Sequence, residues 1–440
     1  MFKKLIAVML ASLFVLTSVV GCADTGDGND AYGTSGTKEL AKSNVVSTVA
    51  SEVKEGTKKD VKIGVVLIGD NTETYSKAHI DGIRTACEHL GIDPDDSEQV
   101  VWKMTIDESA NCKTAIDELV AQNCNLIITN SYGHQTYTEA AAETYKDRDI
   151  QFIAMTGDTA AGSGLDNLSN AFTEVYQARY VSGVVAGMKL KELVDAGKIT
   201  DENKDENGNI KIGYVGAFPF AEVISGYTAF YLGVKSIVDN VVMDVTFTQS
   251  WHDSDKEAEA AKNFISNGCV IISQHADSEG APMAVQNANN DGKVVYSVCY
   301  NIDLTSMGGA ILTSAMNNWS VYYEYAIKTV MNGGKVATNW VGGYTQDAVK
   351  ISALGSEVAE GTEAKVNEVI AAIKAGTLHV FDTSKFTVDG KTLTWAYATD
   401  TDGDFVNDSN NVISDGYFHE SHTQSAPTFS IRIDGINAHD

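Results

Sequence analysis

The sequence has few prolines and few positive charges, and each shortage argues against a class of protein. Only 4 prolines occur in 440 residues, which leaves no proline-rich linker or stalk. Lysine and arginine number 32 against 59 aspartates and glutamates, so the formal net charge is −27. We therefore expect no nucleic-acid partner, because phosphate binding needs a basic surface. The hydrophobic fraction of 43% is typical of a globular protein with large cores.

Motifs for metal binding and catalysis are also missing. The 6 cysteines include no CxxC or CxxH spacing, so a zinc site is not expected. We predict buried free thiols at Cys87, Cys112, Cys124, Cys269 and Cys299. No P-loop, HExxH motif or serine nucleophile elbow occurs. The prediction is a protein without a cofactor and without catalysis.

One acidic turn has closely spaced carboxylates of the kind that can hold calcium. The spacing lacks the glycine and glutamate positions of an EF-hand, so a plain acidic hairpin turn is the favoured interpretation. The calcium alternative would use Asp400, Asp402, Asp404 and Asp408.

The first 22 residues have the features of a bacterial lipoprotein signal. Lys3 and Lys4 precede an apolar run, Leu5 to Val20, which is too short for a membrane span of about 20 residues. The run ends Val-Val-Gly-Cys, which resembles a lipobox with Cys22 as the lipidated residue; the alternative is an ordinary signal peptide with a chance cysteine. We predict a signal peptide at 1–22 and a flexible polar tether at 23–60. Membrane contact would then be through the lipid alone, at the outer face of the bacterial cell membrane.

Two series of alternating strand and helix patterns follow the tether. The first contains the apolar runs 62–69, 100–106 and 125–131, and the second begins with a similar run at 211–218. Short crossings between such strands imply parallel sheets covered by helices. Ligands of such sheets sit outside the carboxyl ends of the strands, so we predict two α/β lobes joined by a hinge, with a ligand cleft between them.

The boundaries of the lobes follow from the same patterns. Lobe 1 is predicted at 61–175, with 304–335 returning to it. Lobe 2 is predicted at 176–303 and is completed by 336–376, in which 340–354 forms a strand pair. Residues 377–440 are expected to form a β-like C-terminal extension.

Several motifs together resemble a known family. They are FTEVYQARYVSGVVAG, VGAFPFAEVISGYTAFYLG, TQSWHDSDKEAEAAKNFISNG, VIISQHADS and LTSAMNNWSVYYEYA. The combination, over Lys62 to about Ala375, resembles the basic membrane protein family of solute-binding lipoproteins. That family includes purine-nucleoside receptors, and the motifs look most similar to its purine-base-binding branch. The resemblance implies the type I periplasmic-binding fold, a purine base or nucleoside as ligand, and an ABC transporter permease as partner.

The resemblance also implies which residues meet the ligand. Tyr75 is expected to stack on the base. Trp251, from the motif TQSWHDSDKEAEAAKNFISNG, and Asp277, from VIISQHADS, are also expected to contact the ligand. The full set implied is Tyr75, Ser76, His79, Ser131, Tyr132, Phe172, Glu174, Phe218, Phe220, Trp251, Asp277, Asn301, Asp303 and Asn317. Nucleoside receptors carry a lysine near the last positions, and its absence from 314–317 favours a base.

Structural alternatives remain open for some of these residues. Asp277 could cap the helix that begins near Gly280. Trp251 could pack in the hinge or core, and His275 is better explained as a structural hydrogen-bonding group than as a ligand contact. Aromatic stacking also serves sugars, so a sugar or a signalling molecule is an alternative ligand. A nucleoside-processing enzyme is a weaker alternative, since a catalytic triad is assembled across a fold and not from neighbours such as His275, Asp277 and Ser278.

Overall fold

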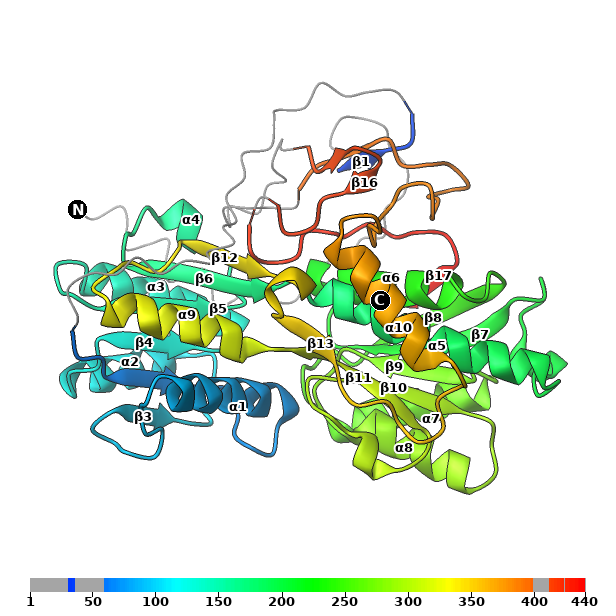
Figure 1. Cartoon of the computed structure of the whole chain (residues 1–440), viewed down its shortest axis with the longest axis horizontal. Helices are drawn as coiled ribbons and strands as arrows, with labels where there is room; N and C mark the ends of the chain where they lie inside the picture. The colour runs from blue at the N-terminus through cyan, green and yellow to red at the C-terminus, as the bar shows by residue number, and fades with distance from the viewer. Residues whose placement is uncertain (1–30, 36–58, 399–410, 423, 440) are drawn as a thin grey trace. The chain divides into compact units, whose positions relative to one another are not determined.

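The computed structural model describes residues 31–35, 59–398, 411–422 and 424–439. Cys22, most of the predicted tether and the acidic turn from Asp400 to Asp408 lie outside these residues. Two sheets covered by helices confirm the predicted α/β class (Figure 1). Among the helices described, none combines the length and the apolar character needed to cross a membrane.

The first sheet is all parallel. Its strands are β2 (Ile63–Val66), β3 (Val100–Lys103), β4 (Leu126–Thr129), β5 (Gln151–Met155), β6 (Leu168–Thr173) and β12 (Asn339–Gly342). Their order is β12-β6-β5-β4-β2-β3. The helices of this lobe are α1 (Thr74–His89), α2 (Ala110–Ala121), α3 (Gln135–Thr144), the short α4 (Ala160–Ser163) and α9 (Trp319–Met331).

Alternation along β2 shows how the first lobe is built. Ile63 and Val65 join the core that includes α1 and α9, whereas Val66 joins the core that includes α2 and α3. Successive side chains of a strand point to opposite faces of the sheet, so helices cover both faces. A strand covered in this way is apolar along its whole length, which is why the sequence shows continuous apolar runs.

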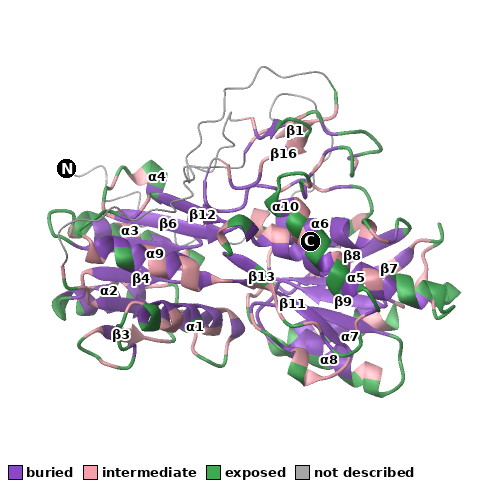
Figure 2. Cartoon of the chain, in the orientation of Figure 1, coloured by how far each residue is buried: buried purple, intermediate pink, exposed green. Residues whose placement is uncertain are grey.

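The second sheet is parallel except at one edge. Its strands are β7 (Ile210–Gly216), β8 (Val241–Phe247), β9 (Ile271–Gln274), β10 (Tyr296–Tyr300), β11 (Ile311–Asn317), β13 (Val349–Ile351) and β17 (Ile436–His439). Their order is β13-β11-β10-β9-β7-β8-β17, and β13 runs antiparallel to β11. The helices of this lobe are α5 (Val175–Asp195), α6 (Ala221–Lys235), α7 (Ser254–Ser266), α8 (Gly280–Asn290) and α10 (Thr362–Lys374). Figure 2 shows the buried residues concentrated in the two sheets and on the helix sides that face them.

The predicted chain crossings between the lobes need two corrections. The segment 304–335 does not return to the first lobe as a whole, because β11 pairs with β10 in the second sheet and only α9 packs on α1. Within 336–376, β12 pairs with β6 in the first sheet before β13 pairs with β11. The strand pair predicted at 340–354 is therefore wrong, since β12 and β13 belong to different sheets. A short apolar run predicts a strand but does not specify its neighbour.

The C-terminal extension contains short strands around its own aromatic core. These strands are β14 (Trp395–Ala396), β15 (Ile413–Ser414) and β16 (Tyr417–Phe418), and β14 pairs with β1 (Tyr32–Gly33) near the start of the described chain. The rings of Phe381 and Phe429 stack with their centroids 4.2 Å apart. β17 then adds the end of the chain to β8, so the extension is fastened to the second sheet.

Helices α5 and α6 approach each other closely at two glycines. A methyl group on Gly183 would lie 2.2 Å from the Phe230 carbonyl oxygen, and one on Gly233 would lie 2.1 Å from the Tyr180 carbonyl oxygen. Such distances are below van der Waals contact, so this helix pair requires glycine at both positions.

The Gly233→Ala variant tests this packing. An alanine in place of a helical glycine ordinarily stabilises a protein by about 1 kcal/mol. Here the added methyl must push the helices apart, so we expect the free energy of unfolding to fall by about 1–3 kcal/mol. Val194→Ala, on an exposed part of α5, is the control and should change stability by less than about 0.5 kcal/mol. Stabilisation by Gly233→Ala in denaturant unfolding would contradict the close approach.

Candidate functional site

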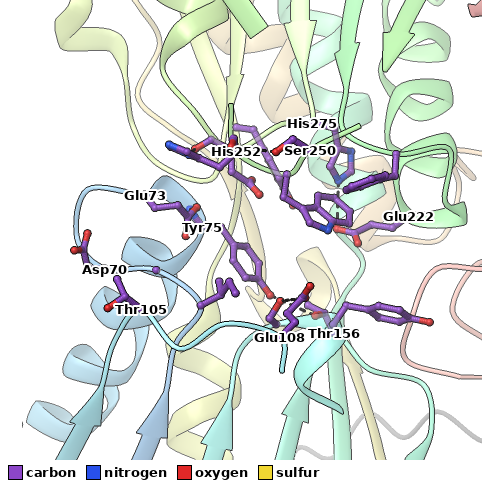
Figure 3. Close-up of a pocket in the computed structure, with 18 of the residues that line it drawn as sticks. Asp70, Glu73, Tyr75, Thr105, Glu108, Thr156, Glu222, Ser250, His252 and His275 are labelled. Carbon is purple, nitrogen blue, oxygen red and sulfur yellow. Dashed lines mark hydrogen bonds and ion pairs between the residues drawn. The ribbon is translucent and has the colours of Figure 1, made fainter. Parts of the chain in front are cut away.

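A cavity of about 550 Å³ lies between the carboxyl ends of strands from both sheets. From the first sheet it is lined by residues that follow β2, β3, β4 and β5, together with the start of α1. From the second sheet it is lined by residues that follow β7, β8 and β9, with Tyr300 at the end of β10. Figure 3 shows Tyr75, Glu108 and Thr156 facing Ser250, His275 and Glu222 across it. This is the position at which open parallel sheets bind ligands.

The backbone is strained at the strand ends that border the cavity. Thr105, Thr156 and Gln249 line it with φ angles of 55°, 59° and 56°, and Asn301, behind it, has a φ of 67°. Positive φ is rare for residues other than glycine, above all for β-branched threonine. Each such residue costs about 1–3 kcal/mol and persists only where the surrounding structure enforces it, which is common at ligand sites.

Aromatic rings enter the cavity from both lobes. Tyr75, in the first turn of α1, donates a hydrogen bond from its hydroxyl to the Asn130 carbonyl, which fixes its ring. From the second lobe come Phe218 and Trp251, whose ring centroids lie 5.4 Å apart in an edge-to-face arrangement. Rings on both sides can hold a flat ligand by stacking, which contributes about 0.5–1.5 kcal/mol per pair beyond area burial.

Three of the carboxyl groups that line the cavity have a raised pKa. Asp277 accepts a 2.7 Å hydrogen bond from the Asn301 amide, and burial, followed by repulsion from Glu73, raises its pKa well above the ordinary value. Burial raises the pKa of Glu222 to about 7 and also raises the pKa of Glu73. Glu73 caps α1 by accepting from the backbone N–H groups of Tyr75 and Ser76 at 2.6 and 2.7 Å. Glu222 can therefore present either an acceptor or an O–H donor near neutral pH.

His275 supports Glu222 from the second sheet. Burial lowers the pKa of His275 well below its ordinary range, and the nearby Arg179 lowers it further, so the imidazole is neutral. Its Nε2 lies 3.2 Å from the Glu222 carboxylate, to which it can donate. Arg179 is itself behind the cavity wall, where it donates to the Gln274 carbonyl at 2.6 Å and covers the Tyr300 ring.

No lysine or arginine is among the described residues that line the cavity. The same part of the chain contains no group of three or more histidine, cysteine, aspartate or glutamate residues placed to hold a metal ion. The cavity surface thus combines carboxyl groups with aromatic rings and offers no lysine or arginine to an anionic ligand.

The two lobes touch at one edge of the cavity. The Thr74 hydroxyl, at the start of α1, donates a 2.8 Å hydrogen bond to the Asp277 carbonyl. His252 Nδ1 lies 3.2 Å from the same carbonyl oxygen. Asp277, a candidate ligand contact of the second lobe, is therefore hydrogen-bonded through its backbone carbonyl to the first helix of the first lobe.

Six of the predicted ligand contacts lie in this cavity. The structure brings Tyr75, Ser131, Tyr132, Phe218, Trp251 and Asp277 together at its wall. Ser131 donates to Glu108 at 2.5 Å. The alternative role for Asp277, capping the helix near Gly280, does not occur, because Glu279 precedes α8 and the Asp277 carboxylate is used by Asn301.

The remaining predicted contacts lie elsewhere. Ser76, His79, Phe172, Asn301 and Asn317 are buried, and their side chains hold other residues of the protein. Ser76 accepts from the Gly69 backbone, His79 stacks on Trp319, and Phe172 meets the same indole edge-on. Asn317 accepts from the Thr173 hydroxyl where β6 and β11 end.

Three predicted contacts are displaced from the cavity in different ways. Phe220 packs on Phe218 but points outward with 48% of its surface exposed. Asp303 is exposed and accepts from the backbone and hydroxyl of Thr305. Glu174 lines a different cavity, between the crossing after β6 and the C-terminal extension.

Sequence reasoning missed three acidic residues that line the cavity at or near the starts of helices. Glu222 belongs to the motif VGAFPFAEV, in which only the phenylalanines were taken as ligand contacts. Glu73 is the N-cap of α1, two residues before Tyr75, and Glu108 lies in the loop between β3 and α2. A carboxylate just after a buried parallel strand was the available signal, because that position faces the ligand edge of the sheet.

These features define a two-lobed solute-binding protein of the type I periplasmic fold. The family model Bmp, described as ABC transporter substrate-binding protein PnrA-like, matches residues 61–382. The chain belongs to this family, as its motifs indicated. The family description is thus that of a substrate-binding protein of an ABC transporter.

Curated relatives share modest identity with the chain. A purine-binding protein of Brucella abortus is 28% identical over 77% of this chain and 88% of its own length. A putative ABC transporter glucose-binding protein of Haloferax volcanii is 26% identical over 63% of this chain and 64% of its own length. Among solved structures, an ABC transporter solute-binding protein of Aeropyrum pernix superposes with a TM-score of 0.59 at 16% identity, covering 73% of this chain and 93% of the other. This last likeness concerns the fold alone.

The raised pKa of Glu222 predicts a pH-dependent stability difference. Its folded pKa of about 7 lies above the ordinary 4.5, so the folded state binds more protons and loses stability as pH rises towards and through 7. Glu222→Gln removes this loss. Its side chain keeps 22% exposure, which solvates part of the charge. We therefore expect the variant to gain about 1–2 kcal/mol over the unaltered protein at pH 8.

The measurement is denaturant unfolding of both ligand-free proteins at pH 5 and pH 8. The buried histidines have lowered pKa values, so their contribution to stability changes with pH in the opposite direction. Both proteins contain these histidines, so this contribution cancels when the variant is compared with the unaltered chain. Glu202→Gln, at an exposed carboxyl outside the cavity, is the control and should change stability by less than about 0.5 kcal/mol. An equal gain for Glu222→Gln at both pH values would contradict the assignment.

Proposed function

We propose that this chain is an extracytoplasmic, lipid-anchored solute-binding protein that captures a purine base or nucleoside in the interlobe cavity and delivers it to an ABC importer. The observation that carries the proposal is the cavity surface, which has carboxyl groups and rings from both lobes and no lysine or arginine. The family membership and the named ligand of the Brucella relative support it.

The chemistry of a purine fits this surface. Its flat ring can stack between Tyr75 and the pair Phe218 and Trp251. Its edge presents N–H donors, which the carboxylates of Asp277 and Glu222 can accept, and ring nitrogens, to which a protonated carboxyl can donate. Buried polar groups left unpaired cost about 1–3 kcal/mol each, so the site would reject ligands without matching donors.

The base is the favoured form of the ligand. Asp303 and Asn317 lie away from the cavity wall, and 314–317 contains no lysine of the kind expected in nucleoside receptors. A phosphorylated nucleotide is disfavoured, because its anion would meet carboxylates with no lining cation. The site contains no motif for chemistry, so we propose binding and release without turnover, through lobe closure around the ligand.

A sugar is the second candidate ligand. The Haloferax relative carries a glucose-binding name, and tryptophan with carboxylates also suits a pyranose. The two ligands differ in their polar groups: a sugar offers hydroxyls around its ring, whereas a base concentrates N–H donors on one edge.

Calorimetric titration distinguishes these ligands. We expect adenine, guanine or hypoxanthine, or one of their nucleosides, to bind more tightly than millimolar, and glucose not to compete. Asp277→Asn keeps the shape and the oxygen that accepts from Asn301 but removes the charge. Its affinity should fall about tenfold to a hundredfold. The matched control Asp303→Asn, at an exposed carboxylate outside the cavity, should bind as the unaltered protein does.

Weak binding of every purine would overturn the ligand assignment, and glucose binding in its place would favour the second candidate. Equal losses in Asp277→Asn and Asp303→Asn would show that the cavity is not the site. The lipid anchor is tested separately: Cys22→Ser should release the protein from membranes, and retention of this variant would contradict the anchor.

A further inference from the structure

The C-terminal extension forms a second cavity of about 330 Å³ against the lobe crossings. Its walls come from the start of α5, the strand β12, the residues after α10, and residues 417–422 of the extension. Figure 1 shows the extension, in orange to red, beside α10 and α6. Residues 417–422 lie beyond residues 61–382, the part of the chain that matches the family model, so the model does not cover this wall of the cavity.

Two carboxyl groups line this cavity. Glu174 accepts from the Gln177 amide at 2.6 Å and from the Tyr176 hydroxyl at 3.3 Å. Glu420 is 5% exposed, and its Oε2 accepts from the backbone N–H groups of Thr428 and Phe429 at 3.1 and 2.8 Å. Burial raises the pKa of both groups to about 7, although these hydrogen bonds oppose the shift.

No cationic side chain of lysine or arginine is among the described residues that line this second cavity. The titratable groups that face the two carboxyls are Tyr176, His379, Tyr417, His419 and His422. Burial lowers the pKa of His419 and of His422, so these imidazoles are neutral at neutral pH. The carboxylates therefore lack a lysine or arginine as counter-charge on the surface of the cavity, and buried charges of one sign are costly without a partner.

Polar atoms beside the carboxyls also lack partners. The Ser421 hydroxyl lines the cavity with 3% of the residue exposed and has no hydrogen-bond partner among the described residues. Glu420 Oε1 has no partner of normal geometry either, although the Ser225 hydroxyl is close enough to lower the pKa of this carboxyl. Buried polar groups in proteins are nearly always satisfied, so these atoms indicate an occupant that forms hydrogen bonds.

Aromatic rings complete the lining. Tyr176 stacks on Phe381 with centroids 5.3 Å apart, and His379 stacks on Tyr417 at 3.7 Å. Rings beside carboxylates attract a positively charged nitrogen through the negative face of the ring. A metal ion fits less well, because no described group of histidine and acidic residues is placed to ligate one.

We propose that this second cavity binds a small organic ammonium ion, with Glu174 and Glu420 as counter-ions and Ser421 as a hydrogen-bonding group. The cation supplies the charge that the cavity surface lacks, and the ring of Tyr176 contacts its carbon-bound hydrogens. The cavity is small enough to exclude polymers and large enough for an ammonium ion with a few carbon atoms.

The test is calorimetric titration of the full chain with tetramethylammonium, ethanolamine and putrescine at constant ionic strength, with sodium chloride as the blank. We expect saturable binding of at least one amine. Because both carboxyls have a pKa of about 7, the dissociation constant should be at least about tenfold lower at pH 8 than at pH 6. Zinc chloride is titrated as a separate arm.

The Glu174→Gln and Glu420→Gln variants should each weaken amine binding at least tenfold. Glu363→Gln, on the exposed surface of α10, is the matched control and should bind as the unaltered protein does. Glu174 is only half-buried, so its variant remains informative if Glu420→Gln fails to fold, which circular dichroism would show.

Absence of binding by all three amines, equal binding by Glu174→Gln, or binding of zinc alone would each overturn the proposal. The purine titrations are independent of this result, because Glu174 and Glu420 do not line the interlobe cavity.

Discussion

The interlobe cavity depends on three carboxyl groups that the fold removes wholly or partly from water. Asp277, Glu222 and Glu73 come from three different segments, and each has a raised pKa because burial disfavours its charge. Repulsion from Glu73 and Glu222 adds to the shift of Asp277. A ligand with N–H donors lowers the free-energy cost of burying these carboxylates by hydrogen bonding to them. Ligand binding can thus stabilise the two lobes together.

The rest of the fold holds these groups in place. Parallel strands bring their carboxyl ends to one edge of each sheet, and left-handed residues such as Thr156 and Gln249 redirect the chain there. The Asn301 amide orients Asp277, and His275 orients Glu222. Close packing of α5 on α6 through Gly183 and Gly233 supports the second sheet behind them. Rigid scaffolding of this kind reduces the ordering that the ligand must impose.

The sequence patterns predicted the sheets because both are buried on two faces, which leaves continuous apolar runs such as Ile63–Val66. They did not predict that β12 and β13 separate, since neither strand encodes its neighbour. Tyr75 and Asp277 were placed in the cavity by their motifs, but His79 and Phe172 were not distinguishable from core residues. Glu222 was missed because its role comes from its position beside His275 and Arg179, which lie far from it in sequence.

The central claim is that the interlobe cavity recognises a flat, nitrogen-rich heterocycle through these carboxyl groups and rings. The most direct measurement is to purify the unaltered protein without added ligand, denature it, and determine the ultraviolet spectrum and mass of whatever small molecule is released. The account predicts a purine base or nucleoside, and predicts that Asp277→Asn prepared in the same way releases much less of it. Release of a sugar, or of equal amounts of purine from both proteins, would contradict it.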